Sequence, residues 1–343
     1  MKVGYIAPQS IAAVNGGLRT QALFTAAHLK ELGIELVFIS PWDDISTMDI
    51  DLFHVFSASV DNIGIVSRLH ELGKKIVLSP VLFSNRSASN IRKLLKVEEK
   101  LTSFSAGIRS EFAHKKEICS KADILLPNTS DESNLISTAF DIPTSLLHVI
   151  PNGVEKRFID SDSTLFEKEI GFKDFVLFAG QASAPRKNVL GLLEAFEGIN
   201  EKLVIIGDFG NSEYSQKCLS IADENPNVHL MNSLDHNSEL LSSAYAACKV
   251  FVLPSQFETP GIAAMEAALA GANIVITEVG GTKDYFKDYA TYIAPHSNKD
   301  IRKGIEKAMN IPRSTDLKDH ILKNYTWYKV AEQTMIQYKK VLE

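Results

Sequence analysis

Two glutamates eight positions apart are the residues whose chemistry first attracts attention. Glu258 stands in a polar loop that follows the apolar run Val250 to Leu253, and Glu266 stands among alanines. A carboxylate in apolar surroundings needs a hydrogen-bonding partner or a ligand. The simpler interpretation is that Glu258 is a surface loop residue and that Glu266 pairs with a nearby lysine. The strand, loop and helix pattern around them favours a ligand.

The residues between these glutamates predict the start of a helix. Pro260 is well suited to a first helical position, the alanine-rich run after it favours a helix, and Gly271 is a plausible end. The first N–H groups of a helix have no acceptor within it, so they attract a phosphate. An anion held there, with a carboxylate on either side to accept hydroxyls, predicts a nucleotide sugar as the ligand.

Two further loops at predicted strand ends carry suitable groups. The loop Gly180 to Asn188 supplies Arg186 and Lys187, and the loop Gly207 to Gly210 supplies glycines that allow close backbone approach. Arginine, lysine and backbone N–H groups can stabilise a diphosphate leaving group, so neither a metal nor a cofactor is expected. The alternative is that both cations are simply solvated.

The elements that must position these loops alternate between short apolar strands and amphipathic helices, which predicts parallel sheets. We expect an α/β fold of two Rossmann-like domains, 1–154 and 155–325, with ligands outside the carboxyl ends of the strands. The stretch 149–154 is expected to be a strand that ends in an Asn-Gly turn. Asn188 is expected to cap the next helix. The predicted strands are Val3 to Ala7, Ile34 to Ser40, Leu52 to Phe56, Lys75 to Leu78, Asp123 to Leu126, Phe175 to Ala179, Leu203 to Ile206, Val228 to Met231, Val250 to Leu253 and Asn273 to Thr277.

The first half also offers candidates for a site. A loop with Asn15, Gly16 and Gly17 follows the first strand, and glycines there permit positive φ and close approach to a ligand. Arg19 follows this loop and is a candidate for the acceptor side. His54, in the third strand, is either an acid/base group on that side or a structural histidine.

Composition excludes several classes of protein. The 343 residues carry a net charge of −6, which argues against a nucleic-acid binder. Three widely spaced cysteines indicate reduced thiols rather than disulfides or a zinc site. No signal-peptide pattern and no apolar run long enough for a membrane helix is found, so we expect a cytoplasmic protein.

The region 87–120 reads as one long helix with an apolar stripe that includes Phe104 and with a basic-rich opposite face. A solvated face is the simpler interpretation. The functional alternative is that the basic helix near residues 91–116 contacts an acceptor or the inner face of an anionic membrane.

Taken together, these motifs resemble the retaining glycosyltransferases of family four, which have the GT-B fold. The resemblance covers nearly the whole chain. Its most specific element is the Glu-x7-Glu pair in F-E-T-P-G-I-A-A-M-E-A. The loop G-Q-A-S-A-P-R-K-N, the stretch P-N-G-V at 151–154, the early G-G and the segment Y-T-W at 325–327 are also similar to the family.

The resemblance implies transfer of a hexosyl unit, with mannosyl or glucosyl as our guess, from a nucleoside diphosphate sugar to a saccharide or lipid-linked hydroxyl in bacterial polysaccharide or glycolipid synthesis. Domain 155–325 would bind the donor, domain 1–154 would face the acceptor across a cleft, and 326–343 would pack back onto 1–154. The implied catalytic residues are Glu258, Lys187 and Arg186, and the implied donor-binding residues are Gly16, Gly17, Gln181, Gly207, Asp208, Thr259, Pro260, Gly261, Ile262 and Glu266.

Individual roles follow from the same resemblance. Lys187 and Arg186 would bind the diphosphate, Glu258 would bind hydroxyls of the sugar, and Glu266 would bind the ribose. Gln181 stands where many relatives have an arginine, and Ser79 stands in a stretch where many have a histidine. The alternatives are a nucleotide-sugar epimerase of the same fold and a non-catalytic binding module.

Overall fold

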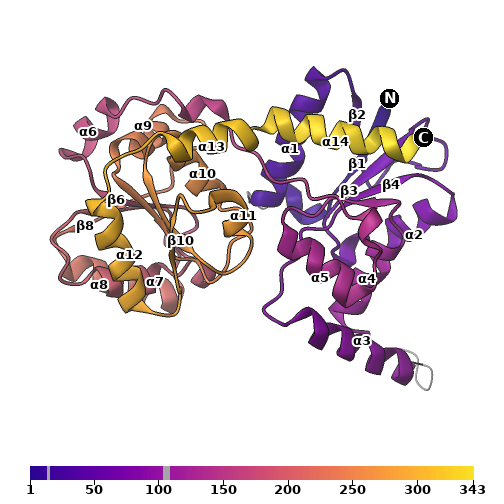
Figure 1. Ribbon diagram of the computed structural model, residues 1–343, viewed down its shortest axis with the longest axis horizontal. Coiled ribbons are helices and arrows are strands. Elements are labelled where there is room, and N and C mark those ends of the chain that lie inside the picture. The colour runs from indigo at the N-terminus through magenta and orange to yellow at the C-terminus, as the bar shows by residue number, and fades with distance from the viewer. Residues whose placement is uncertain (14–15, 103–108) are drawn as a thin grey trace. The chain divides into compact units, whose positions relative to one another are not determined.

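The structure, a computed structural model, describes residues 1–13, 16–102 and 109–343. Two compact units divide the chain: unit 1 comprises Met1–Gly153 and Trp327–Glu343, and unit 2 comprises Val154–Thr326 (Figure 1). Each unit contains one parallel sheet with helices packed against it, so the predicted α/β fold with two Rossmann-like halves is confirmed. No helix in the described part of the chain is long and apolar enough to cross a membrane.

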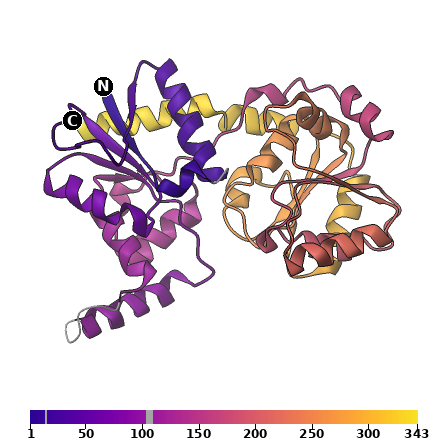
Figure 2. The same ribbon diagram turned by 180° about the vertical axis from the view of Figure 1, so that it is seen from behind.

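Unit 1 is built on a five-stranded sheet in the order β2-β1-β3-β4-β5. The central strand β3 is buried along its whole length, as its apolar sequence requires. Figures 1 and 2 show α1 and α14 on one side of this sheet and α4 and α5 on the other. The strands are β1 (Lys2–Ile6), β2 (Glu35–Phe38), β3 (Leu52–Phe56), β4 (Ile76–Ser79) and β5 (Ile124–Leu125), and the helices are α1 (Gly17–Glu31), α2 (Ile63–Glu71), α3 (Ala88–Thr102), α4 (Glu111–Ser120), α5 (Ser130–Phe140) and α14 (Trp327–Leu342).

Unit 2 is built on a six-stranded sheet in the order β11-β10-β9-β6-β7-β8. Strands β6, β7 and β9 are runs of apolar side chains and are fully buried, which suits strands covered on both faces. The strands are β6 (Val176–Ala179), β7 (Leu203–Ile206), β8 (Val228–Met231), β9 (Val250–Leu253), β10 (Asn273–Thr277) and β11 (Thr291–Ile293), and the helices are α6 (Thr164–Ile170), α7 (Val189–Phe196), α8 (Glu213–Glu224), α9 (Glu239–Ala247), α10 (Ile262–Leu269), α11 (Thr282–Phe286), α12 (Asn298–Asn310) and α13 (Asp316–Asn324).

Three local predictions were wrong. The stretch 149–154 forms no strand, because Pro151 has no N–H for a ladder and Ile150 N makes a single bond to Pro127 O at 2.9 Å. Strand β11 was missed because it has three residues at the edge of its sheet. In the described part of the region 87–120, α3 and α4 are separate helices, because residues 109–110 are not helical. Ser110 is the N-cap of α4, and its N–H and hydroxyl both donate to the Glu98 carboxylate at 2.6 Å.

Two residues used in the sequence argument, Asn15 and Phe104, lie outside the described residues.

The C-terminal helix α14 joins unit 1 through a buried polar chain. The hydroxyl of Tyr338 lies 2.5 Å from Nδ1 of His54, and the hydroxyl of Ser79 lies 2.9 Å from Nε2. The His54 ring is 1% exposed and stacks on Phe56 with 4.1 Å between the ring centres. Near the start of α14, Trp327 stacks on Phe24 of α1. Helix α14 is therefore part of the core of unit 1.

The expectation that His54 serves the acceptor side is corrected by this environment. Both ring nitrogens are engaged by buried hydroxyls, and no face of the ring is open. Burial lowers the pKa of His54 to about 3, so the ring is neutral at ordinary pH. His54 is a structural histidine.

This burial makes the stability of unit 1 depend on pH. An unfolded histidine takes up a proton near pH 6.5, whereas folded His54 resists protonation until about pH 3. Between these values the unfolded state binds more protons, so the free energy of unfolding should fall as pH is lowered, by at most about 1.4 kcal/mol per pH unit. Both tryptophans, Trp42 and Trp327, lie in unit 1, so urea unfolding followed by tryptophan fluorescence reports this unit.

The variant His54→Gln should lose that pH slope between pH 4 and 6.5, and His70→Gln, at an exposed position of α2, should keep it. Equal slopes in the wild type and in His54→Gln would contradict the assignment.

Candidate functional site

Loops from four neighbouring parallel strands meet at the carboxyl edge of the unit 2 sheet. Strands β7, β6, β9 and β10 stand next to one another in the order of the sheet and run in the same direction. The loops that follow parallel strands emerge at one edge, which is where open α/β sheets bind ligands. These loops are Gly180 to Asn188 after β6, Gly207 to Gly210 after β7, Pro254 to Gly261 after β9 and Glu278 to Gly281 after β10.

A largely buried ion pair joins two of these loops. Nζ of Lys187 lies 2.6 Å from Oε1 of Glu258, and the exposed fractions of the two side chains are 15% and 8%. The guanidinium of Arg186 lies 3.5 Å from the same oxygen and donates to the carbonyl of Phe257 at 3.1 Å. The structure therefore brings together the three residues that the sequence predicts to be catalytic.

Backbone and amide contacts hold the loops in this arrangement. The N–H of Gln256 donates to the carbonyl of Arg186 at 2.8 Å. The side-chain amide of Asn188 donates to the carbonyls of Pro254 at 3.2 Å and Pro295 at 2.7 Å. Asn188 occupies the N-cap position of α7 (Val189–Phe196), as predicted, but its backbone is left-handed (φ 56°) and its side chain makes no cap bond to the helix. It connects the loops that follow β6, β9 and β11 instead.

The backbone of Glu258 is fixed from the other side by the turn after β10. Its N–H donates to the carbonyl of Val279 at 3.1 Å, and its carbonyl accepts from the N–H of Gly281 at 3.0 Å. Gly280 lies so close that a Cβ there would sit 2.1 Å from the Glu258 carbonyl oxygen, and its φ is 98°. Gly280 belongs to the turn V-G-G at 279–281. Its contact with Glu258 shows that it shapes the site.

Helix α10 begins later than predicted. Its first residue is Ile262, and Gly261, with φ 76°, precedes it, so Pro260 is not the first helical residue. A Cβ on Gly261 would come within 3.0 Å of Leu253, which explains the glycine. The first N–H groups of α10 have no acceptor within the helix and remain suited to an anion.

The carboxylate of Glu266 is held by hydrogen bonds from two other elements. The hydroxyl of Tyr245, in α9, donates to Oε2 at 3.1 Å, and Nε2 of His236, in the loop after β8, lies 2.7 Å from Oε1. Glu266 is 3% exposed. The hydrogen bond to Glu266 raises the pKa of His236, and burial raises the pKa of Tyr245. Sequence reasoning missed both partners, although a histidine in a loop after a predicted strand was a usable signal.

The other residues expected to bind the donor have varied surroundings. A Cβ on Gly207 would lie 2.2 Å from the carbonyl oxygen of Gly180, so the glycine lets these loops approach each other. Asp208 is exposed and accepts the N–H of Ser233 at 2.8 Å and its hydroxyl. The remaining residues of this group differ in burial: Gln181 is exposed, and Thr259, Pro260 and Ile262 are half-buried.

Four candidates belong to unit 1. Gly16 has extended backbone with φ −155° rather than a positive φ, and Gly17 starts α1 with open space where a Cβ would point. Arg19 donates to the carbonyl of Ile11 at 2.7 Å. His54 is buried, as described above. The early glycines are therefore not needed for left-handed backbone.

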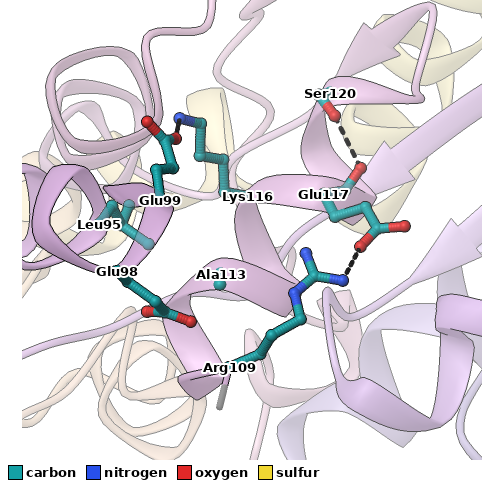
Figure 3. Close-up of a pocket in the computed structure, with 8 residues that line it drawn as sticks. All are labelled: Leu95, Glu98, Glu99, Arg109, Ala113, Lys116, Glu117 and Ser120. Carbon is teal, nitrogen blue, oxygen red and sulfur yellow. Dashed lines mark hydrogen bonds and ion pairs between the residues drawn. The ribbon is translucent and has the colours of Figure 1, made fainter. Parts of the chain in front are cut away.

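A separate pocket of about 270 Å³ lies in unit 1 between α3 and α4 (Figure 3). Four of its charged groups are paired with one another, Lys116 with Glu99 at 2.8 Å and Arg109 with Glu117 at 2.7 Å, and Glu98 accepts from Ser110. It contains none of the predicted site residues. We therefore place the candidate site at the loops of unit 2.

Comparison with known proteins relates unit 2 to a known family. Residues 162–326, which include all four loops of unit 2, match the family of glycosyl transferases group 1. The resemblance drawn from the sequence is thereby confirmed at the level of the family. An uncharacterized glycosyltransferase of Methanocaldococcus jannaschii is 26% identical over 61% of this chain and 57% of its own length. The chain thus matches little more than half of that relative.

Solved structures share the fold of the whole chain. Sucrose-phosphate synthase of Thermosynechococcus elongatus has a TM-score of 0.76 at 15% identity and covers 99% of each chain. HepE of Anabaena, solved in complex with UDP, has a TM-score of 0.74 at 14% identity and covers 99% of this chain and 100% of its own. The GT-B fold predicted from the sequence is confirmed by these neighbours.

The contact between Gly280 and Glu258 leads to a stability prediction. Gly280→Ala should destabilise unit 2 because the added methyl group clashes with the Glu258 carbonyl and because φ is positive. We expect a cost of about 1–2 kcal/mol from φ and a further ~1–3 kcal/mol from overpacking. Gly271→Ala is a matched control, since Gly271 has φ 92° and nothing within 4 Å of a Cβ. Differential scanning calorimetry should show a clearly larger fall in Tm for Gly280→Ala, and equal falls would contradict the clash.

Proposed function

We propose that this protein is a retaining glycosyltransferase that moves a hexosyl unit from a nucleoside diphosphate sugar to an acceptor hydroxyl. The observation that carries the proposal is the buried Lys187–Glu258 pair in the loops of unit 2. It combines a cation for a phosphate with a carboxylate for sugar hydroxyls. The family match and the UDP held by the structural neighbour HepE support a nucleotide-sugar donor.

Unit 2 would bind the donor, and unit 1 would supply the acceptor side. Lys187 and Arg186, together with the first N–H groups of α10, would neutralise the diphosphate. Glu258 would accept hydrogen bonds from hydroxyls of the sugar, and Glu266 from those of the ribose. Lys187 already contacts Glu258. The phosphate of an incoming donor would bind the lysine and its sugar hydroxyls would bind the glutamate, so the donor would contact both members of an existing ion pair.

The reaction would break the bond between the anomeric carbon and the diphosphate oxygen. The acceptor hydroxyl oxygen would form the new bond to that carbon on the same face, and the leaving diphosphate would take the hydroxyl proton together with the electrons of the broken bond. Arg186, Lys187 and the helix amides would stabilise the charge that grows on the diphosphate, which makes catalysis independent of a metal.

Two rival functions make different predictions. An epimerase of this fold would convert one nucleotide sugar into another. It would neither hydrolyse the donor to free sugar nor transfer the sugar to an acceptor. A binding module would shift the melting temperature with nucleotides but would release no product. Product analysis of donor incubations, with mannosyl and glucosyl donors tested first, distinguishes all three.

The ion pair gives the sharpest test of catalysis. Lys187→Ala and Glu258→Ala should each lower turnover of the preferred donor at least about 100-fold, because each removes a charge from the transition-state site. The measurement is release of nucleoside diphosphate from a panel of UDP-, GDP- and ADP-sugars, with EDTA present in a parallel series. EDTA should leave the wild-type rate unchanged.

Lys173→Ala is the matched control, because Lys173 is exposed and precedes β6, at the opposite end of the strand from the site. Its activity should equal that of the wild type. Undiminished turnover in both site variants would refute the assignment, and no turnover or thermal shift with any donor would refute the transferase.

Helix α3 supports a lipid-linked acceptor, as in polysaccharide or glycolipid synthesis. Its side chains Leu94, Val97 and Leu101 are 36%, 55% and 61% exposed, and their spacing places them on one face. Exposed Lys93 and Lys96 lie beside this face. Most of the other cations that the sequence placed in a basic surface are neutralised by ion pairs: Arg92 with Asp141, Arg109 with Glu117, Lys115 with Glu111 and Lys116 with Glu99.

The membrane contact proposed for residues 91–116 is therefore restricted to the exposed face of α3 that carries Leu94, Val97 and Leu101. An apolar strip flanked by lysines suits an anionic membrane surface.

Val97→Glu combined with Leu101→Glu should therefore lower binding to vesicles of phosphatidylcholine and phosphatidylglycerol at least tenfold, measured by co-sedimentation. Leu165→Glu, at a residue of α6 that is 46% exposed, is the control and should bind like the wild type. Binding that is weak in the wild type, or unchanged in the double variant, would remove the membrane contact from the proposal.

A further inference from the structure

A cluster of charged groups extends from Glu266 toward the first residues of unit 2, and the roles proposed above leave most of it unexplained. His236 connects the two parts: Nε2 lies 2.7 Å from Glu266 Oε1, and Nδ1 lies 3.6 Å from Glu155 Oε2. Arg157 pairs with Glu155 at 3.3 Å and donates to the carbonyl of His236. Tyr245 completes the cluster at Glu266 Oε2. Elements far apart in the sequence thus converge on one carboxylate.

The proton on Nε2 follows from the chemistry of its partner. An ionised carboxylate can only accept, so Nε2 of His236 donates to Glu266 whether the ring is neutral or charged. In the neutral ring, Nδ1 can accept from the guanidinium of Arg157, which lies 3.5 Å away. In the charged ring, Nδ1 carries a proton and faces Glu155. Either state keeps the bond to Glu266.

Each oxygen of Glu266 has one protein donor, Nε2 of His236 for Oε1 and the Tyr245 hydroxyl for Oε2. A carboxylate has about two acceptor positions per oxygen, so roughly one position on each oxygen remains. Two neighbouring hydroxyls on one ring, such as the 2′ and 3′ hydroxyls of a ribose, match a pair of acceptors on one carboxylate.

We propose that His236 is a positioning residue that, with Tyr245, orients the Glu266 carboxylate so that its free acceptor positions recognise the ribose diol of the donor nucleotide. This inference rests on the proposed function, because it takes the ligand of unit 2 to be a nucleoside diphosphate. It adds a specificity: ribonucleotides are selected over 2′-deoxyribonucleotides, and the selection depends on a histidine outside the Glu-x7-Glu motif.

Protonation of His236 adds a charge effect. With a neutral ring, the cluster of Glu155, Glu266 and Arg157 carries one net negative charge, and with a charged ring the four groups balance. An anionic nucleotide is repelled less by the balanced cluster. The bond to Glu266 raises the pKa of His236, so the charged ring persists above the ordinary pH range of a histidine. Nucleotide affinity should therefore be highest at low pH and should decrease as pH rises through this raised pKa.

The experiment compares dissociation constants of UDP, GDP and ADP with those of their 2′-deoxy forms by titration calorimetry. For the nucleotide that binds best, the wild type should prefer the ribo form at least tenfold. In His236→Ala the preference should fall to about threefold or less. In His236→Gln, whose amide can still donate to Glu266 but cannot titrate, most of the preference should remain, and the dependence of affinity on pH should disappear.

His229→Gln is the matched control, because His229 lies on the adjoining strand β8 and packs on Phe172. It should keep the wild-type preference. The positioning role would be overturned if His236→Ala kept the wild-type preference for ribonucleotides. It would also be overturned if His236→Gln lost this preference as fully as His236→Ala. A purely structural histidine would lower affinity for both sugar forms equally and leave their ratio intact, which would also overturn it.

A second measurement separates this inference from the proposed function. In ligand-free protein, an NMR titration of the His236 ring should show its pKa falling when Glu266 is replaced in Glu266→Gln. An unchanged pKa would overturn the coupling between the two residues. If the coupling is present but no nucleoside diphosphate binds the wild type, the proposed function fails, and the ribose role of His236 fails with it.

Discussion

The ion pair between Lys187 and Glu258 sets the arrangement of the loops around it. Removing either charge from water costs on the order of several kcal/mol, and each charge offsets that cost only while the other stays in place. Lys187 comes from the loop after β6 and Glu258 from the loop after β9, so the two strands must deliver them in register. The Gln256–Arg186 backbone bond, the Asn188 amide and the turn at Gly280 all reduce the freedom of these loops.

The two glutamates of the motif have opposite surroundings although eight residues separate them. Glu258 meets two cations, so its charge is compensated locally and an anion can enter beside it without facing an unbalanced carboxylate. Glu266 meets a phenol and an imidazole, so it is oriented by directional hydrogen bonds. Electrostatic compensation suits a reacting phosphate, and directional hydrogen bonding suits recognition of a diol. The different partners of the two carboxylates suit the different tasks proposed above.

Much of this architecture follows from local sequence patterns. Five strands, Leu52–Phe56, Leu203–Ile206, Val228–Met231, Val250–Leu253 and Asn273–Thr277, have the predicted bounds, because short, largely apolar runs are typical of parallel sheets. Lys187 and Glu258 could be assigned to one site because both follow such strands. The partners of Glu266 could not, since His236 and Tyr245 reach it through tertiary packing. His54 was misjudged because its place in a strand is visible in the sequence, whereas the Tyr338 hydroxyl that engages it lies 284 residues away.

The composition of unit 1 from two separate segments has a consequence for synthesis on the ribosome. Residues 327–343 are translated after all of unit 2, so unit 2 has its complete sequence before α14 exists. Until then the sheet of unit 1 lacks the Tyr338 hydroxyl for His54 and the indole of Trp327 that covers Gly153. Domains generally fold as units during translation. The nascent chain would therefore contain the complete sequence of unit 2 while unit 1 still lacks the helix that covers part of its apolar core.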